Sequence, residues 1–224
     1  SVATSAGISS WQLINRYKSE DIPIVMTSTS EVYAGLSEIG VEVDLPAPEN
    51  LPMVVSDILN PRWSYAGGKI FSEVLAHSAA KQFGTDIRVA RLHNIYGSRM
   101  GNEHFIPEFY QRLNSGDYRL FGPDQTRSFM HVDDAVEALI RLSEVSTSDS
   151  FSIFNIGGAE EVSVRSVAQK IQKLAGIEEE LIECDPPPGS VERRLPDCSK
   201  LWNTVGQWEL VDLDKGLRET LFGE

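Results

Sequence analysis

Helix-length segments with one apolar face alternate with short apolar runs in the first part of this chain. Ile8, Trp11 and Ile14 recur at a spacing of three residues, which fits one face of a helix over residues 4–18. The apolar run 22–26 follows and is bounded by polar residues, as a short buried strand would be. A helix that leads into a buried strand is the repeating unit of parallel α/β sheets.

The same order of elements occurs a second time. Residues 64–83 predict a helix, and residues 86–92 predict a second buried strand. Repetition of this unit favours an α/β fold in which a parallel sheet is covered by helices on both faces. The apolar face of the second helix is expected to carry Ile70, Val74, Leu75 and Ala79.

Beyond Gly97 the pattern changes, and the chain is expected to leave the sheet and to return to it later. An amphipathic helix near residues 106–113 and a short strand at 118–121 belong to this excursion. A helix at 133–142 and a strand at 152–156 are expected to rejoin the main sheet.

The C-terminal part predicts helices joined by an extended connector. Ser163 is a good N-cap for a helix that runs to about Leu174. The proline run 186–188 then forces an extended stretch, and two further helices are expected after it.

The charge balance of the chain limits the classes of partner. Acidic residues number 33 and basic residues 20, which gives a net charge of −13, and no basic stripe compensates locally. Such a surface repels a phosphate backbone, so we expect no nucleic-acid partner. A small phosphorylated ligand is compatible with it, because roughly two or three well-placed arginines suffice to bind a diphosphate.

The sequence also bears on compartment and on metal binding. It has no apolar run of about 18 residues and no signal-peptide pattern at its start, so neither a membrane nor export is expected. Cys184 and Cys198 fit free thiols in a reducing compartment, which favours the cytoplasm. The histidines show no metal-ligand spacing with these cysteines, and we therefore expect no metal site.

Tyr65 and Lys69 form a Y-x-x-x-K pair inside a predicted helix. Residues four apart on a helix lie on the same face, one turn from each other. A nearby ammonium favours the phenolate, which lets a tyrosine act as an acid or base closer to neutral pH than its ordinary pKa of about 10 allows. The pair is therefore a candidate for proton transfer, although its spacing also occurs by chance.

A cluster of hydroxyl groups and a carboxylate follows the first predicted strand. Residues 27–33 read T-S-T-S-E-V-Y and would stand at the carboxyl edge of a parallel sheet. Open α/β sheets bind their ligands at that edge. An ordinary strand exit rich in serine and threonine is the alternative interpretation of this segment taken alone.

Five segments, in this order, resemble the landmarks of extended short-chain dehydrogenases/reductases that act on nucleotide sugars. The resemblance covers nearly the whole chain and implies a Rossmann-like parallel sheet, NAD as cofactor and a nucleotide-diphosphate sugar as ligand. It rests on T-S-T-S-E-V-Y (27–33), Y-A-G-G-K (65–69), R-L-H-N-I-Y-G (91–97), Q-T-R-S-F (125–129) and F-N-I-G-G (154–158).

The resemblance implies a role for particular residues at the reacting centre. Thr29 matches the residue that hydrogen-bonds the sugar hydroxyl to be oxidised, and Tyr65 matches the catalytic base. Lys69 matches the residue that holds the nicotinamide ribose and tunes the tyrosine. Glu31 is the candidate second acid or base. Tyr65, Lys69, Leu92 and His93 are the expected cofactor-binding residues.

A second group of residues is expected to bind the nucleotide sugar. Arginine makes bidentate bonds to phosphate oxygens, and the arginines of this group lie in segments predicted to leave the sheet, although surface salt bridges are an alternative use for them. The expected substrate-binding residues are Asn94, His104, Phe105, Arg127 and Arg194.

The chain departs from the family pattern at its beginning. Family members start with a strand and a G-x-x-G-x-x-G turn that seats the cofactor pyrophosphate, and no such turn is present here. Roughly 80 to 100 residues, the length of the first βαβαβ half, are expected to be missing. Ala34 and Ser98 stand where many relatives have glycine and proline, which indicates a divergent subgroup.

Two domains are expected. Residues 1–97 and about 129–158 would form the remainder of a Rossmann-like, NAD-binding domain, and about 98–128 with 159–224 a smaller nucleotide-sugar domain. We expect the full-length protein to be a homodimer.

The resemblance implies a reaction that begins with oxidation of the sugar at C4 by Tyr65 and NAD. Ser30-Glu31 disfavours a dehydratase, which usually has Asp-Glu there. The Thr-Ser-Glu segment and Arg194-Leu195-Pro196 look like UDP-glucuronate decarboxylases, whereas H-N-I-Y-G and Q-T-R-S-F are similar to epimerases. We favour epimerisation, with decarboxylation as the alternative. A non-catalytic or defective nucleotide-sugar-binding fragment is the hypothesis from another class.

Overall fold

The computed structural model describes residues 2–61, 63–187 and 190–223. These residues fall into two compact units, each built from three stretches of chain. The first unit comprises 1–93, 137–156 and 196–207, and the second comprises 94–136, 157–195 and 208–224.

A three-stranded parallel sheet forms the centre of the first unit. Strands β1 (Ile24–Thr29), β2 (Ile87–Leu92) and β7 (Phe151–Ile156) pair in that order. β2 is the most buried strand, because it has a neighbour on each side and is covered by helices. The expected α/β class with a Rossmann-like parallel sheet is confirmed.

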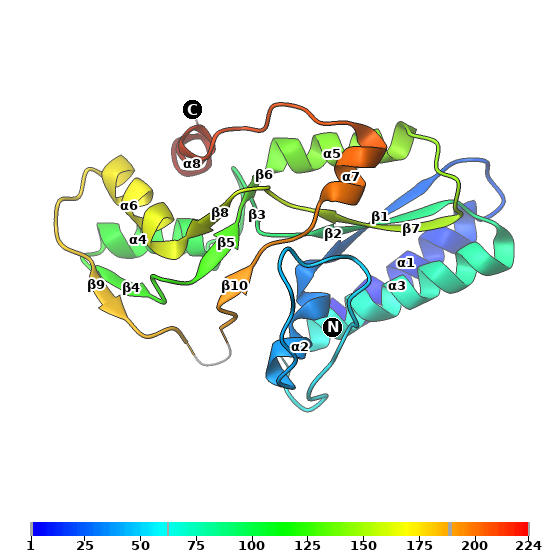
Figure 1. Cartoon of the computed structure of the whole chain (residues 1–224), viewed down its shortest axis with the longest axis horizontal. Helices are drawn as coiled ribbons and strands as arrows, with labels where there is room; N and C mark the ends of the chain where they lie inside the picture. Colours follow the sequence, from blue (N-terminus) through cyan, green and yellow to red (C-terminus); the bar gives the residue numbers. More distant parts are fainter. Residues whose placement is uncertain (1, 62, 188–189, 224) are drawn as a thin grey trace. The chain divides into compact units, whose positions relative to one another are not determined.

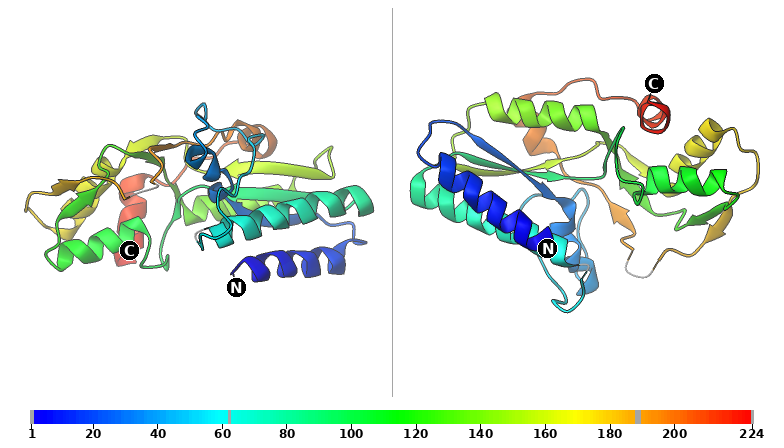
Figure 2. Two further views of the ribbon diagram at one scale, coloured as in Figure 1. Left: turned by 90° about the horizontal axis from the view of Figure 1, so that it is seen from below. Right: turned by 180° about the vertical axis from the view of Figure 1, so that it is seen from behind.

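Helices cover both faces of this sheet (Figures 1 and 2). α1 (Val2–Tyr17) packs along α3 (Trp63–Phe83) on one face, and the part of α5 (Val132–Glu144) that belongs to this unit lies with α7 (Ser199–Val205) on the other. The 3-10 helix η1 (Ser30–Tyr33) and the short α2 (Gly35–Glu38) follow β1 directly. The core shared by α1, α3 and the sheet holds Ile14, Ile24, Met26, Ala76, Ala79, Ala80, Ile87 and Val89.

Two expectations for this unit were wrong in detail. The first strand begins at Ile24, not Ile22, and extends to Thr29, because its polar carboxyl end pairs with β2 as fully as its apolar beginning. The buried face of α3 is lined mainly by small residues such as Ala76 and Ala79, whereas Val74 is 54% exposed. Small side chains let a helix approach the sheet and α1 closely, and this close approach decides which face is buried.

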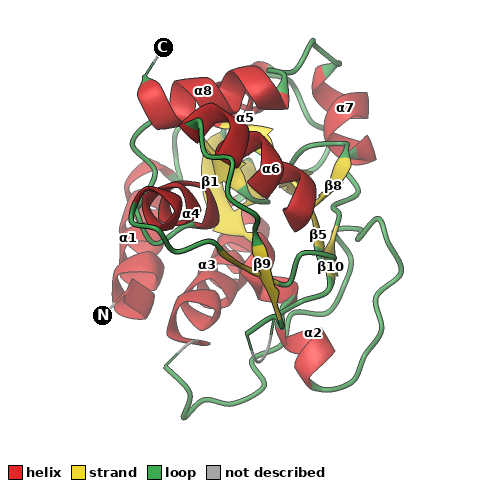
Figure 3. Cartoon of the chain, turned by 90° about the vertical axis from the view of Figure 1, so that its left-hand side faces the viewer, coloured by secondary structure: helices red, strands yellow, loops and turns green. Residues whose placement is uncertain are grey.

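The second unit combines helices with short strands (Figure 3). α4 (Phe105–Asn114), α6 (Val164–Ala175) and α8 (Leu213–Phe222) pack around one core that includes Phe109 and Leu217. Ser163 caps α6 as expected, since its Oγ accepts the N–H of Ser166 at 3.1 Å. The strands are β3 (Ile95–Tyr96), β4 (Arg119–Phe121), β5 (Thr126–Ser128), β6 (Met130–His131), β8 (Glu161–Ser163), β9 (Ile182–Cys184) and β10 (Arg193–Arg194).

The short strands of this unit pair in small ladders. β3 pairs with β6 and β4 with β9, while β5 lies between β10 and β8. Sequence periodicity predicted only the strand near 118–121, because two- and three-residue strands carry no readable alternation. Of the proline run 186–188, Pro188 lies outside the described residues.

The unit boundaries differ somewhat from the expected domains. The chain passes into the second unit at Asn94, and residues 129–136 belong to that unit. Residues 196–207, which carry α7, belong to the first unit because α7 packs on β7. Which unit binds which ligand stays a prediction. Among the described residues, we find no helix with the length and apolar character needed to cross a membrane.

Candidate active site

Thr29 is the last residue of β1 and stands at the carboxyl edge of the parallel sheet. Its Oγ1 accepts the backbone N–H of Glu31 at 3.3 Å and so caps the 3-10 helix that follows. The residue is 8% exposed, and Glu31 is partly exposed. The polar segment predicted to follow a buried strand therefore begins at the edge where α/β sheets bind ligands.

Tyr65 and Lys69 lie on one face of α3, as their spacing indicated. Lys69 Nζ is 6.0 Å from the centroid of the Tyr65 ring and donates a 2.8 Å hydrogen bond to the carbonyl oxygen of Thr27. Burial lowers the pKa of Lys69, and the carboxylate of Glu73 opposes that shift. The Tyr65 side chain is 40% exposed and therefore accessible to a ligand.

The bond from Lys69 to Thr27 ties the helix that carries Tyr65 to the end of β1. α3 also contacts η1, the helix that Thr29 caps. The first unit thus gathers a threonine, a tyrosine and a lysine at one edge of one sheet. A threonine can hydrogen-bond a ligand hydroxyl, a tyrosine can accept its proton, and a lysine supplies a positive charge beside the tyrosine.

Leu92 and His93 follow the central strand at the same edge. Leu92 is the register partner of Thr29, and it is partly exposed. His93 is buried, with its Nε2 3.1 Å from Oδ1 of Asn155. The contact of Leu92 and His93 with the cofactor stays a prediction. The ring of His93 already has a polar partner, Asn155, within the first unit.

In the second unit, three of the expected substrate residues lie near the start of the unit or on α4. Asn94 has a left-handed φ of 43° and donates from Nδ2 to the Ser128 carbonyl at 2.9 Å, so its amide braces β5. His104 precedes α4 and is exposed, without a capping bond from its side chain. Phe105 stacks on Phe109 with 5.7 Å between ring centroids.

Arg127 and Arg194 lie side by side on neighbouring strands. They are register partners in the parallel pair of β5 and β10, and side chains at one register level point to the same face of a ladder. Arg193 is one residue earlier and therefore points to the opposite face, where it forms a 2.7 Å ion pair with Glu161. The family resemblance grouped these two arginines at one ligand, and the strand register shows that they are adjacent.

A cavity of about 820 Å³ lies in the same unit and is lined in part by residues that contact Arg127. Gln125 and Glu192 line it, and both also hold the guanidinium, through Gln125 Oε1 at 3.2 Å and the Glu192 carbonyl at 3.1 Å. Arg127 is thus held by two residues that line a space large enough for a ligand of moderate size, and the lining of that space also includes Asp124, Glu183 and Asp185.

A further polar cluster lies in the second unit. His131, Asp133 and Glu219 offer ligand atoms within 4.8 Å of one another in the described part of the chain. The ring Nδ1 of His131 accepts the N–H of Asp133 at 3.4 Å, and Nε2 is 3.5 Å from a Glu219 oxygen. Both ring nitrogens thus have polar neighbours, and we assign no ion to the cluster.

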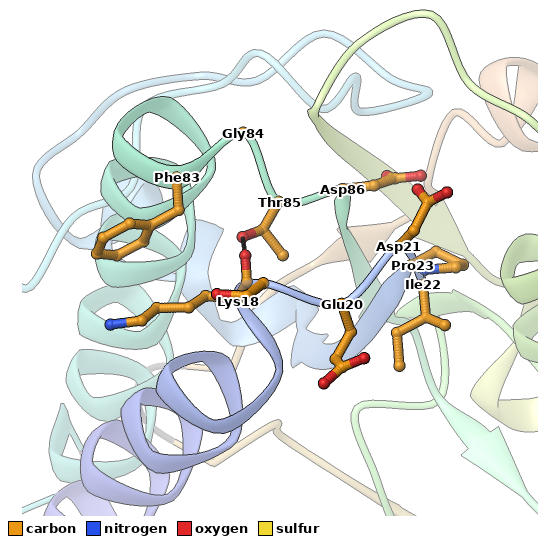
Figure 4. A pocket seen from close by; sticks show the side chains of 10 residues that line it. Lys18, Glu20, Asp21, Ile22, Pro23, Phe83, Gly84, Thr85 and Asp86 are labelled. Carbon is orange, nitrogen blue, oxygen red and sulfur yellow. Dashed lines mark hydrogen bonds between the residues drawn. The ribbon is translucent and has the colours of Figure 1, made fainter.

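A smaller cavity of about 340 Å³ opens at the amino ends of β1 and β2 (Figure 4). Lys18 extends along Phe83 there, with Nζ 4.6 Å from the ring centroid, and Thr85 donates to the Lys18 carbonyl at 3.1 Å. This cavity lies at the opposite edge of the sheet from Thr29, and parallel sheets bind their ligands at the carboxyl edge.

A profile of a known protein family matches most of the chain. Residues 3–157 match the sequence profile of the "NAD dependent epimerase/dehydratase family". The chain belongs to this family. The profile spans β1, α3, β2 and β7, which together form the sheet and the helix that carry the candidate active site.

Curated members of the family share about a third of its residues. UDP-glucuronic acid decarboxylase 1 of Xenopus tropicalis is 32% identical over 202 residues, which are 88% of this chain and 46% of that protein. UDP-N-acetyl-alpha-D-glucosaminuronate decarboxylase of Bacillus cytotoxicus is 34% identical over 209 residues, 88% of this chain and 62% of that protein. The chain therefore spans about half the length of these relatives.

A solved structure of the family shares the fold. UDP-glucuronic acid 4-epimerase from Bacillus cereus, solved in complex with NAD, matches 97% of this chain and 66% of its own with a TM-score of 0.80 and 22% identity. At this identity the likeness shows the fold of the family.

Arg91 and Glu73 are two buried charged residues of the first unit to which the sequence patterns gave no role. Arg91 is 1% exposed and lies in β2, and Glu73 is 3% exposed and lies on α3. The sequence does mark both residues. Arg91 is a charged residue inside a predicted buried strand, and Glu73 is a carboxylate one helical turn after Lys69. Burying a charge without an opposite charge or hydrogen bonds costs a large amount of free energy, so each of these residues implies a partner.

Proposed function

We propose that the full-length protein oxidises a nucleotide-diphosphate sugar at C4 in an NAD-dependent reaction that continues through the 4-keto sugar. The observation that carries this proposal is the bond from Lys69 to the Thr27 carbonyl, which holds the Tyr65–Lys69 pair at the end of the strand that carries Thr29. Membership of the NAD-dependent epimerase/dehydratase family supports it.

The residues present fit a dinucleotide at this edge. A lysine ammonium has three N–H donors, and the Thr27 carbonyl accepts one from Lys69, which leaves donors to bind a ribose. NAD, when bound, supplies the hydride acceptor. In this proposal the Thr29 hydroxyl orients the sugar hydroxyl and Tyr65 takes its proton. The positive charge of Lys69 stabilises the phenolate that receives it.

We infer decarboxylation of a nucleotide uronate as the favoured outcome. A 4-keto group makes a neighbouring C6 carboxylate prone to leave as carbon dioxide. The decarboxylases of Xenopus tropicalis and Bacillus cytotoxicus, each above 30% identity to this chain, support this outcome. Epimerisation stays the second candidate, on the similarity of the H-N-I-Y-G and Q-T-R-S-F segments to those of epimerases.

The substrate test separates these outcomes. We expect the full-length protein to release carbon dioxide from UDP-glucuronate in the presence of NAD, with loss of the uronate signal in proton NMR. Formation of the C4 epimer without carbon dioxide would support epimerisation instead. Absence of turnover with a panel of nucleotide sugars that nevertheless bind would favour a non-catalytic module.

Glu31 is expected to act after C4 oxidation. It is partly exposed beside Thr29, and its backbone N–H donates to the threonine hydroxyl. Glu31→Gln should therefore leave the oxidation step, so that NADH absorbance rises, and slow product formation by about 10²-fold. Stopped-flow absorbance and product NMR measure the two steps separately. Equal loss of both would indicate a structural role instead.

Solvent deuterium gives a second reading of Glu31. If Glu31 acts as a base at C5, deuterium enters C5 of the recovered uronate that still carries its carboxylate with the wild type and is absent with Glu31→Gln. The decarboxylated product is not read, because its C5 takes a solvent proton in any case once carbon dioxide leaves. If neither protein incorporates deuterium at C5, a base at that carbon is ruled out.

We propose that Arg127 and Arg194 bind the diphosphate of the nucleotide sugar. Their side chains share one face of the β5–β10 ladder, and Gln125 and Glu192, which hold the Arg127 guanidinium, line a cavity. Replacing either one by alanine should weaken nucleotide-sugar binding by about 10- to 100-fold, since a charge-assisted hydrogen bond contributes roughly 1.5–3 kcal/mol.

Arg193→Ala is the matched control for this prediction. It removes the same side chain from the same strand, but on the opposite face, where Arg193 pairs with Glu161. Isothermal titration with the nucleoside diphosphate should show unchanged affinity for this control. Equal affinity in all three variants would mean that the phosphates bind at other residues.

The homodimer also stays a proposal. α1 and α3 present exposed apolar side chains, including Ile8, Trp11, Phe71 and Val74, on helices that pack along each other. Apolar surface of this kind supports a protein–protein contact. The cytoplasmic location is not tested by the structure and stays a prediction.

A further inference from the structure

Three polar residues form one level across the central sheet. Ser28 is the register partner of Arg91, and Arg91 is the register partner of Asn155, so the level crosses β1, β2 and β7. All three are buried, at 4%, 1% and 0% exposure. We call these residues the polar rung. It lies one residue before Thr29 on the first strand and carries a full charge through the middle of the sheet.

Glu73 of α3 is bound by two members of this rung. Its Oε1 accepts the Ser28 hydroxyl at 2.5 Å and Arg91 Nε at 3.0 Å, and its Oε2 accepts Arg91 Nη2 at 2.7 Å. The bidentate geometry fixes both the distance and the rotation of the carboxylate relative to the strands. Glu73 lies one helical turn after Lys69, so the same contacts fix where Lys69 stands above β1.

The rest of the rung is held from outside α3. Arg91 Nη1 donates to the Glu49 carbonyl at 2.8 Å and also to the Tyr33 hydroxyl. Tyr33 donates to Asn155 Oδ1 at 3.2 Å, and burial raises the pKa of Tyr33 to about 12, so this hydroxyl stays a donor. The network is thus satisfied at each of these charged and polar groups, as buried networks must be.

Stability alone is a weak reason for such a network. Replacing a buried ion pair by apolar residues of similar volume is often neutral or stabilising, because both charges lose their hydration on burial. A buried pair is better at fixing one geometry, since its directional bonds are satisfied in one arrangement. Here the geometry that it fixes is that of the helix with Tyr65 and Lys69.

We propose that Glu73 and Arg91 are positioning residues that hold α3 on the polar rung and so set the place and the charge of Lys69 for the proposed reaction. This inference rests on the proposed function only for its catalytic consequence. The carboxylate of Glu73 acts on the Lys69 ammonium whether or not a substrate turns over.

The first test needs no substrate. NMR titration of isotope-labelled Lys69 in the full-length protein should give a pKa about 1 unit lower in Glu73→Gln than in wild type. The sign follows from the loss of an opposing negative charge, because burial then lowers the lysine pKa without compensation. An unchanged Lys69 pKa in a folded variant would overturn the proposal, even if the protein proves to have another substrate.

The second test measures turnover of whichever nucleotide sugar the substrate test under the proposed function identifies. We expect Glu73→Gln to lower kcat by about 10- to 100-fold, since small misplacements of reacting groups cost up to roughly that factor. KM should change little, and the alkaline limb of the kcat profile should move to lower pH. A wild-type kcat and pH profile would contradict a positioning role.

A double variant covers the case in which the single variant does not fold. Glu73→Gln alone leaves the buried Arg91 charge uncompensated, whereas Glu73→Gln with Arg91→Met removes both charges. The double variant should fold and still show the lowered Lys69 pKa and kcat. Recovery of wild-type values in it would show that the pair serves stability alone.

The chain offers a matched control on the same strand. Arg88 is 2% exposed and pairs with Asp86 near the amino end of β2, opposite to the candidate site. Arg88→Met also removes a buried charge from this sheet. It should lower stability and leave the Lys69 titration unchanged, so a shift of that titration in the control would overturn the assignment to Glu73 and Arg91.

Discussion

Tyr65→Phe should lower the rate of sugar oxidation at C4 by about 10²- to 10⁴-fold in the full-length protein, the range that a positioned general base contributes. The variant removes one hydroxyl from a side chain that is 40% exposed at the start of α3, so folding should be preserved. Single-turnover NADH absorbance measures the rate, and calorimetry measures binding of the nucleotide sugar, which should be nearly unchanged.

Tyr17→Phe is the control for this variant. Tyr17 is also exposed, at 38%, and ends α1, away from the strand end that carries Thr29. It should retain wild-type oxidation. If Tyr65→Phe oxidises the sugar within tenfold of wild type, another group must accept the proton, and the role given to the Tyr65–Lys69 pair would be wrong.

Phe109→Ala should lower the free energy of unfolding of the second unit by about 3–5 kcal/mol. Phe109 is 0% exposed on α4, where it packs with Ile106, Leu113 and Leu217 in one core. Truncation removes the transfer free energy of the ring and leaves a cavity that the helices around it fill only in part. Hydrogen exchange of the α4 amides reports the opening free energy of this unit without mixing in the first.

Phe222→Ala is the matched truncation on the surface of the same unit. Phe222 ends α8, is 44% exposed and contacts Tyr110 edge to face. We expect it to cost roughly 1 kcal/mol or less, because most of the ring already faces water. A loss below about 1 kcal/mol for Phe109→Ala as well would mean that this core does not hold the second unit together.

The residues proposed to act on the sugar and those proposed to bind its diphosphate lie in different units. The first unit carries the residues proposed for proton transfer, Thr29, Tyr65 and Lys69, on a sheet edge fixed by main-chain pairing. The second carries the paired arginines Arg127 and Arg194. Each set is supported by geometry within its own unit, and each can fail its test without the other.

The sequence by itself determined the fold class and the order of the main elements. The alternation of helix-length segments with short apolar runs placed α1, α3 and β2 in their order along the chain, and β2 is buried over nearly its whole length as expected. The periodicity misjudged the buried faces of α1 and α3, since Ile8, Trp11 and Val74 are exposed. The four-residue spacing of Tyr65 and Lys69 places them on one face of any helix. The motifs also identified the family without any structural information.

Only the tertiary structure decided which residues far apart in the chain meet. Strand register made Arg127 and Arg194 neighbours, and it aligned Ser28, Arg91 and Asn155 into one level that receives Glu73. Sequence patterns report the period of one segment, whereas register depends on how two segments pair. The burial of Arg91 beside Glu73 follows from that pairing, since a charge can enter the centre of a sheet only where an opposite charge arrives from another element.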